Sequence, residues 1–206
     1  MKLPRLYVIA DRAALEARGI SVGEFAREMA GAGVQLLQYR DKVGTPNEVL
    51  RAAKEIAVEF AGVDATLILN DRADLAALAG WGVHVGHLDM QPEDVRLVVG
   101  AAVVGVSTHH DAQVIEADAG AADYVAIGPV FATASKADTE PVVGLAGVRR
   151  ARALTKKPLV AIGGITRENA WSVIEAGADS VAVIGGLVVA GERPGKIAKE
   201  FLELLR

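Results

Sequence analysis

Two apolar segments of the sequence end in a carboxylate. "LILND" finishes at Asp71, and "GVHVGHLD" finishes at Asp89. If both segments are neighbouring strands of one sheet, their ends lie roughly 5 Å apart, and the two acids could share one cation. Carboxylate oxygens suit Mg²⁺, which is often completed by water and substrate phosphates. The alternative is that each acid caps the helix that follows it, and taken singly each acid fits that role equally well.

Cationic side chains follow an earlier apolar segment, "QLLQYRDK". Gln38, Arg40 and Lys42 alternate along it, so in a strand they would share one face that runs from apolar to cationic. A buried strand has no structural need for such charges unless an anion meets them. The alternative is a strand end that emerges into solvent, which is as good an account of Lys42 on its own.

Glycine pairs end two later apolar segments, at residues 163–164 and 185–186. Glycine lets backbone N–H groups approach a phosphate closely. Between the acids and the glycines, "GVSTH" ends its segment at residues 105–109, and a long connection spans residues 132–144. Connections of that length in a small domain are often functional. We therefore expect a phosphate site near the glycine pairs and polar contacts from the long connection.

The histidines do not indicate a zinc site. His84 and His87 are three positions apart in an expected strand and would face opposite ways, as would the adjacent pair at 109–110. The sequence has no cysteine, so thiolate metal sites, disulfides and a cysteine nucleophile are excluded. Oxygen ligands remain the candidates for a metal.

Eight short apolar segments must position these residues. Near-continuous apolar runs are typical of strands buried on both faces, as in parallel sheets. The segments are 5–11, 34–40, 66–71, 82–87, 103–108, 123–130, 158–164 and 180–186. Stretches with helical spacing separate them, such as "TPNEVLRAAKEIAVEFAG", "TRENAWSVIEAGA" with Thr166 as its expected N-cap, and "KIAKEFLELLR".

This alternation predicts an α/β fold, a (β/α)8 TIM barrel, with residues 1–206 forming a single domain. In such a barrel the active site lies at the C-terminal ends of the strands, where the residues described above fall. A doubly wound open sheet is the alternative, but it usually has fewer strands, and no G-x-G-x-x-G follows the first segment.

Composition limits the partners. A 51% apolar share over 206 residues suits one sizeable core, and a net charge of -4 without a basic cluster argues against nucleic acid. The first residues lack the apolar stretch of a signal peptide, and the longest apolar run is too short for a bilayer. We therefore expect a cytoplasmic protein with small phosphorylated ligands and no membrane partner. A homodimer is compatible with the sequence.

Along nearly its whole length the chain resembles the thiamine-phosphate synthase family. The matching stretches, in order, are "QYRDK" (38–42), "NDRADLA" (70–76), "GVHVGHLD" (82–89), "GVSTH" (105–109), "ADYVAIGPVFATASK" (122–136), "VAIGGIT" (160–166) and "AGADSVAVI" (176–184). The resemblance implies a Mg²⁺-dependent transferase in a TIM barrel. It would join hydroxymethylpyrimidine diphosphate to a thiazole phosphate, with or without a carboxylate, and release pyrophosphate.

The resemblance also implies roles for individual residues. Asp71 and Asp89 would bind Mg²⁺. Arg40, Lys42 and Lys136 would neutralise the leaving diphosphate. The pyrimidine diphosphate would be held by Gln38, Arg40, Lys42, Asn70, Ser107 and Lys136. The thiazole phosphate would be held by Thr133, Ser135, Gly164, Ile184 and Gly185. Tyr39, Asp41 and Ala134 lie within the same stretches and would also bind substrate.

Three positions depart from the family pattern. His87 replaces a glutamine, Ser135 replaces a threonine, and Gly185 replaces a serine. The last departure falls in the expected thiazole phosphate pocket. Two alternative functions remain: a thiazole tautomerase of the same superfamily, which has no need for the paired acids, and a non-catalytic phosphate-binding barrel, which has no need for the whole set of acids and cations.

Overall fold

The fold is known from a computed structural model that describes residues 2–133 and 140–206. Eight parallel strands pair in chain order and close into a barrel. The strands are β1 (Leu6–Asp11), β2 (Leu36–Arg40), β3 (Thr66–Asn70), β4 (Gly82–Val85), β5 (Val104–Thr108), β6 (Tyr124–Ile127), β7 (Leu159–Ile162) and β8 (Ser180–Val183). The predicted (β/α)8 barrel is confirmed, and each strand lies within the apolar segment that predicted it.

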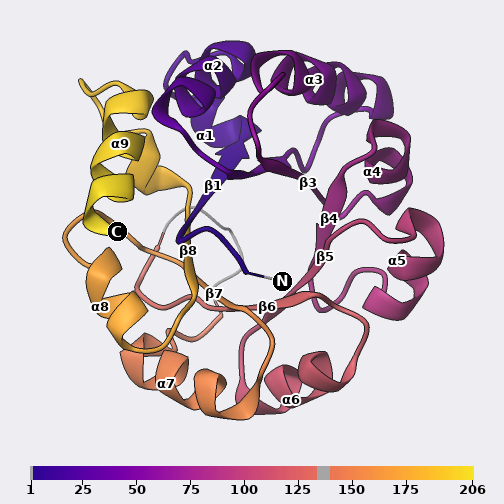
Figure 1. The fold of residues 1–206 in the computed structure, drawn as a ribbon, viewed down its shortest axis with the longest axis vertical. Helices are drawn as coiled ribbons and strands as arrows, with labels where there is room; N and C mark the ends of the chain where they lie inside the picture. The colour runs from indigo at the N-terminus through magenta and orange to yellow at the C-terminus, as the bar shows by residue number, and fades with distance from the viewer. Residues whose placement is uncertain (1, 134–139) are drawn as a thin grey trace.

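Helices form a ring around the barrel (Figure 1). They are α1 (Arg12–Glu16), α2 (Val22–Ala32), α3 (Pro46–Glu59), α4 (Ala73–Ala79), α5 (Pro92–Val99), α6 (Asp111–Ala119), α7 (Gly144–Leu154), α8 (Ala170–Glu175) and α9 (Pro194–Leu204), with a 3₁₀ turn at Gly185–Leu187. The α3 helix begins with a capping box, in which Thr45 and Glu48 each bond the other's backbone N–H. None of the described helices is long and apolar enough to cross a membrane.

One predicted helix start is wrong. The sequence predicts an N-cap at Thr166, but α8 begins at Ala170 and Asn169 precedes it. The Thr166 backbone N–H instead donates to Asn169 Oδ1 at 2.8 Å, and Asn169 Nδ2 donates to the Gly164 carbonyl at 3.0 Å. Asn169 therefore orders the connection that follows β7, and the helix starts only after this connection is complete.

The core has two parts because alternate side chains of each strand face opposite ways. The larger part lies between barrel and helices. The smaller part fills the barrel interior and consists of Leu3, Tyr7, Ile9, Leu36, Ile68, Tyr124, Ala126, Val160, Ala182 and Ile184. The N-terminal segment lies across one opening of the barrel, and its Leu3 joins this inner cluster (Figure 1). The interior is therefore a packed core and not a pore, as expected for this fold.

Charged clamps hold the end of the barrel where the strands begin. Arg152 on α7 donates to Asp179 Oδ2 at 2.8 Å, and the same oxygen accepts the backbone N–H of Leu159, the first residue of β7, at 2.8 Å. Arg96 and Asp123 repeat this arrangement at the start of β5. Each clamp thus ties one helix to the beginning of a strand, far from the opposite end where the candidate site residues lie.

We expect Arg152→Ala to destabilise the protein without affecting the candidate site. The substitution removes a charged hydrogen bond to Asp179 and a 3.0 Å bond to the Lys157 carbonyl, which together should cost roughly 1–3 kcal/mol of unfolding free energy. Thermal unfolding measures this as a fall of several degrees in Tm. The matched control is Arg149→Ala on the exposed side of the same helix. Equal Tm values for the two variants would contradict the clamp.

Candidate active site

The predicted site residues gather at the C-terminal ends of the strands. Because all eight strands are parallel, these ends form one rim. Arg40 ends β2, Asn70 ends β3, and Asp71 follows directly. Asn70 lies opposite His84 of β4 in the strand register, so β3 and β4 deliver neighbouring polar groups to this rim.

Asp71 and Asp89 come together as the sequence predicted. Asp71 adopts a left-handed backbone conformation with φ of 62°, the only non-glycine residue among those described with positive φ. Its Oδ2 accepts a hydrogen bond from Lys42 Nζ at 2.5 Å. Burial raises the pKa of the Asp71 carboxyl, Lys42 lowers it, and the neighbouring Asp89 raises it again, so that the net shift is upward. Two like charges that face each other favour a cation between them.

The helix-capping alternative does not describe these acids. The residues at the N-cap positions of α4 and α5 are Arg72 and Gln91, and neither helix start has a side-chain cap hydrogen bond. Asp89 Oδ2 accepts instead from the backbone N–H of Gly86 at 2.9 Å, which folds the connection after β4 back on itself. Asp71 turns the chain sharply out of β3, since aspartate tolerates the left-handed region better than most residues.

Arg40 is held by a partner that the sequence did not reveal. Its Nη1 donates to Asp11 Oδ2 at the end of β1, while Asp11 Oδ1 caps α1 by accepting from the Ala14 backbone N–H at 2.9 Å. Asp11 is buried and Arg40 is largely so. Asp11 is the last residue of the first apolar segment, and that position alone could have marked it as a rim residue.

Two predicted substrate-binding residues are occupied by structural contacts. Asp41 accepts hydrogen bonds from the backbone N–H groups of Val43 and Gly44 at 3.1 and 2.8 Å and from Arg12 at 3.0 Å. Tyr39 packs in the cluster between barrel and helices, and its hydroxyl donates to Asp41 at 3.3 Å. Both shape the connection after β2, which presents Lys42.

Asn70 carries an unsatisfied donor. Among the described residues, its Nδ2 is the one buried side-chain nitrogen or oxygen without a hydrogen-bond partner. A buried amide without a partner costs roughly 1–3 kcal/mol, so such groups are usually satisfied by a bound molecule, water or ion. Its position beside Asp71 suits an oxygen of a ligand that also contacts the acids.

Gln38 and Ser107 face the barrel interior beneath the rim. Gln38 lies opposite Ile9 in β1, and Ser107 lies opposite Ala126 in β6, so both share the inward face with residues of the inner cluster. Gln38 is only 2% exposed, whereas Ser107 is partly accessible. These two side chains form the floor of the site.

The glycine side of the rim adopts the backbone that glycine alone allows easily. Gly163 and Gly164 have φ of 106° and 62°, and a Cβ on Gly164 would lie 2.6 Å from the Ala132 carbonyl oxygen. Ile184 is buried, and Gly185 begins the 3₁₀ turn after β8 in an exposed position. The Phe131 backbone N–H donates to the Gly163 carbonyl at 3.0 Å, so the connection after β6 that leads to Thr133 begins on the same side. Ala134, Ser135 and Lys136 lie outside the described residues.

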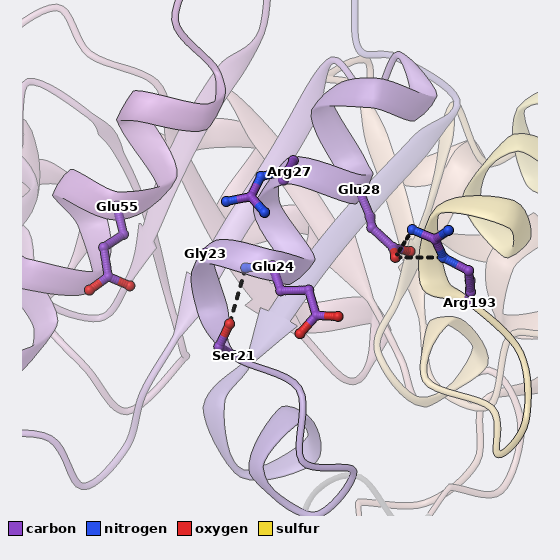
Figure 2. A pocket seen from close by; sticks show the side chains of 7 residues that line it. All are labelled: Ser21, Gly23, Glu24, Arg27, Glu28, Glu55 and Arg193. Carbon is purple, nitrogen blue, oxygen red and sulfur yellow. Dashed lines mark hydrogen bonds and ion pairs between the residues drawn. The ribbon is translucent and has the colours of Figure 1, made fainter.

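A surface pocket outside the helix ring does not compete for this role. It has a volume of about 450 Å³ and is lined by α2 residues, by Glu55 of α3 and by Arg193 (Figure 2). Both of its arginines are paired: Arg193 pairs with Glu28 of the pocket at 2.8 Å, and Arg27 pairs with Glu59 beside it at 2.9 Å. The predicted site residues lie elsewhere, on the barrel rim.

The donor set at the rim fits magnesium. The described residues contain no cluster of three or more histidine, aspartate or glutamate side chains that could hold a metal. Asp71 and Asp89 alone would leave most coordination positions to water and to oxygens of the substrate, which is how Mg²⁺ is commonly bound in proteins. The raised pKa of Asp71 and the unsatisfied Asn70 amide are both consistent with a site completed by a cation and an anionic ligand.

A family model, two sequence relatives and one solved structure point to the same family. Residues 6–187 match a family model described as thiamine monophosphate synthase. The chain is 53% identical to a thiamine-phosphate synthase of Koribacter versatilis, covering 100% of this chain and 97% of the relative. It is 42% identical to a thiamine-phosphate synthase of Methanoregula boonei, covering 89% of this chain and 85% of the relative. A solved thiamine phosphate pyrophosphorylase of Pyrococcus furiosus superposes with a TM-score of 0.87 at 30% identity, covering 98% and 95%.

We expect the rim to bind Mg²⁺ and to bind it less tightly as the pH falls. A carboxylate must lose its proton to bind a metal, and the raised pKa of Asp71 means that protons compete at a higher pH than for an ordinary aspartate. We expect Mg²⁺ alone to raise Tm at neutral pH and to lose this effect on acidification. Asp71→Asn should abolish the effect, and Asp64→Asn, an exposed acid before β3, should preserve it.

The raised pKa of Asp71 also determines whether Asp71→Asn raises or lowers Tm when no metal is bound. A carboxyl whose pKa is raised on folding costs stability once the pH exceeds its unfolded value. Without Mg²⁺, Asp71→Asn should therefore not lower Tm at neutral pH. A marked loss of Tm in that variant would show that the acid is a structural residue.

Proposed function

The chain belongs to the thiamine monophosphate synthase family, and from that premise we propose that it joins hydroxymethylpyrimidine diphosphate to hydroxyethylthiazole phosphate, releasing pyrophosphate and forming thiamine phosphate. Its relatives are named thiamine-phosphate synthase, so the chain is a transferase of thiamine biosynthesis. The substrates and the Mg²⁺-assisted mechanism are our proposal. The observation that carries it is the group formed by Asp71, Asp89 and Lys42 beside the unsatisfied amide of Asn70.

The diphosphate would bind across the β2 and β3 ends of the rim. Lys42 and Arg40 supply positive charge, and Asn70 supplies the donor that lacks a partner. Lys42 now pairs with Asp71, so binding would exchange that contact for one with the ligand. When bound between Asp71 and Asp89, Mg²⁺ would neutralise charge on the diphosphate oxygens. Lys136, in the connection after β6, is proposed to add a further cation.

The reaction we propose breaks the carbon–oxygen bond at the pyrimidine methylene. The bonding electrons leave with pyrophosphate, and the aminopyrimidine ring shares the positive charge that remains. Arg40 and Lys42 stabilise the leaving group as its charge grows, which is where preorganised charge contributes most to rate. The thiazole nitrogen then attacks the methylene. No proton moves in these steps, so no general base is required.

The thiazole phosphate would occupy the opposite side of the rim. The left-handed backbone at Gly163 and Gly164 suits close approach of a phosphate, and Gly185 opens the turn after β8. Thr133 lies on the same side, and we place Ala134 and Ser135 there from the sequence resemblance. A carboxylated thiazole phosphate would also lose carbon dioxide, and the vacated ring carbon would take a proton from water.

The two alternative functions explain fewer of these residues. A thiazole tautomerase has no diphosphate to neutralise, and therefore no use for Asp71, Asp89 and Lys42 together. A non-catalytic phosphate-binding barrel would need the glycine side alone. The discriminating observation is pyrophosphate release that requires both substrates and Mg²⁺ at once.

The central test measures pyrophosphate release in wild type and in two variants. We expect Asp71→Asn and Asp89→Asn each to reduce turnover on the order of a hundredfold or more, because the leaving group loses charge stabilisation. Tm should change little. The control is Asp74→Asn, which removes an exposed acid three residues further on that pairs with Arg72. Full activity in both site variants, or no pyrophosphate from wild type, would contradict the proposal.

Gly185→Ser should strengthen thiazole phosphate binding. A serine hydroxyl can add a charged hydrogen bond worth roughly 1.5–3 kcal/mol, which the wild-type glycine recovers only in part by closer backbone approach. Gly185 does not have positive φ, so serine meets no left-handed backbone penalty. We expect the KM for thiazole phosphate to fall several-fold and the KM for pyrimidine diphosphate to stay unchanged. An unchanged or raised thiazole phosphate KM in a folded variant would show that the hydroxyl is irrelevant.

A further inference from the structure

A chain of hydrogen bonds crosses the barrel interior beneath the candidate site. Gln38 Nε2 donates to the Tyr7 hydroxyl at 2.7 Å, and the Tyr7 and Tyr124 hydroxyls lie 2.8 Å apart. The Tyr124 hydroxyl is 2.9 Å from His84 Nδ1, and His84 Nε2 is 2.9 Å from Ser107 Oγ. The five residues come from β2, β1, β6, β4 and β5. The hydrogen-bond chain therefore connects Gln38 and Ser107, for which the family resemblance implies one shared substrate.

Packing holds the middle of this chain rigidly. Tyr7 and Tyr124 are 1% and 0% exposed and meet edge to face, with ring centroids 6.0 Å apart. His84 stacks on Tyr124 with a centroid distance of 5.5 Å. The Tyr124 ring passes over Gly105 so closely that a Cβ there would lie 2.0 Å from the phenol Cζ. Gly105 thus leaves the space that the chain needs.

The series of hydrogen bonds has a direction because its first donor, the Gln38 amide nitrogen, cannot accept a hydrogen bond. An amide nitrogen only donates, so the Tyr7 oxygen receives that hydrogen and its own hydrogen is available for Tyr124. When Tyr7 donates to Tyr124, the Tyr124 hydrogen is left to donate to His84 Nδ1. Burial raises the pKa of both phenols, so both keep their hydrogens at neutral pH.

The direction continues through the imidazole to Ser107. A neutral His84 that accepts at Nδ1 carries its hydrogen on Nε2 and donates it to Ser107 Oγ. The Ser107 hydroxyl hydrogen is then left to point away from His84, toward the partly accessible site. If the Gln38 amide oxygen faced Tyr7 instead, every hydrogen bond in the series would reverse, and the Ser107 hydroxyl would donate to His84.

We propose that Tyr7, Tyr124 and His84 are positioning residues that couple the Gln38 amide to Ser107 and make Ser107 a hydrogen-bond donor toward the diphosphate. This inference rests on the proposed function for the identity of the ligand. A diphosphate oxygen can only accept, so only the direction from Gln38 toward Ser107 gives it a hydrogen from Ser107. The same direction turns the Gln38 amide oxygen away from Tyr7, where it can accept from an amino group such as that of the pyrimidine.

The first test reads the direction without substrate. Nitrogen NMR of histidine-labelled protein at neutral pH, with His84 assigned by comparison with His84→Asn, should place the hydrogen of His84 on Nε2. Gln38→Met removes the donor that sets the direction, and the His84 signals should shift toward a mixture of the two tautomers. Thr108→Val is the control, since it removes a buried hydroxyl from β5, the strand of Ser107. That hydroxyl donates to the Ala126 carbonyl and takes no part in the series of hydrogen bonds.

Two results of that measurement would overturn the proposal. A hydrogen on Nδ1 in wild type would mean that the chain runs the other way. An unchanged tautomer in folded Gln38→Met would mean that Gln38 does not control His84. Circular dichroism and Tm establish folding for each variant, and a merely structural role for the tyrosines would not produce the tautomer change.

The second test reads the coupling through kinetics. Tyr7→Phe and Tyr124→Phe should each raise the KM for pyrimidine diphosphate on the order of tenfold, as expected for one misaligned hydrogen bond. The KM for thiazole phosphate should stay unchanged. Because both variants interrupt one chain, the double variant should be no worse than either single one. Fully multiplied effects, or an unchanged pyrimidine diphosphate KM in folded Tyr7→Phe, would contradict the coupling.

The two tests separate this inference from the proposed function. If wild type releases no pyrophosphate, the proposed function fails, and the NMR measurement still decides whether the chain has the stated direction. If pyrophosphate is released but the tautomer or the kinetic pattern differs from expectation, the function stands and the positioning role is wrong.

Discussion

Closure of the parallel sheet is the constraint on which the rest of this structure depends. A closed barrel leaves no edge, so every strand must place alternate side chains in one shared interior and must end at one shared rim. The inner cluster fills the space beneath the rim with residues such as Tyr7, Ile68 and Tyr124. Polar side chains that continue the same inward face, including Arg40 and Asn70, emerge just above this cluster. The packed core therefore supplies the floor of the candidate site.

Two cations of the rim pair with carboxylates in the described part of the chain. Arg40 pairs with Asp11, and Lys42 pairs with Asp71. The pKa of Asp71 is raised at this position, because burial and Asp89 together raise it more than Lys42 lowers it. Such an arrangement keeps the side chains near their working positions, and a bound cation and anion would replace contacts that already exist.

The two ends of the barrel use polar groups differently. At the end where strands begin, Arg152 and Asp179 bond backbone groups and satisfy them within the protein. At the rim, the Asn70 amide nitrogen has no hydrogen-bond partner in the described part of the chain. Between the two ends of the barrel, the series of hydrogen bonds that links Gln38 to Ser107 passes through the buried hydroxyls of Tyr7 and Tyr124. The division follows the general pattern of barrel enzymes, in which stability and chemistry occupy opposite faces.

The sequence by itself determined the barrel, the order of its strands and the approximate membership of the rim. Local apolar runs and turn residues carry that information, and Asp71 and Asp89 could be paired because parallel strands must end together. It misplaced the start of α8, because Asn169 orders the preceding connection through contacts that no local pattern specifies.

Only the tertiary structure decided which side chains meet across the barrel. The sequence gives no sign that Asp11 holds Arg40, or that Tyr7 and Tyr124 join Gln38 to His84. These contacts connect residues far apart in the chain, and they depend on strand register, on the tilt of the strands and on the space left by Gly105. The periodicity of the sequence shows which way a side chain faces. Which side chains of different strands come into contact is decided only when the sheet closes into a barrel.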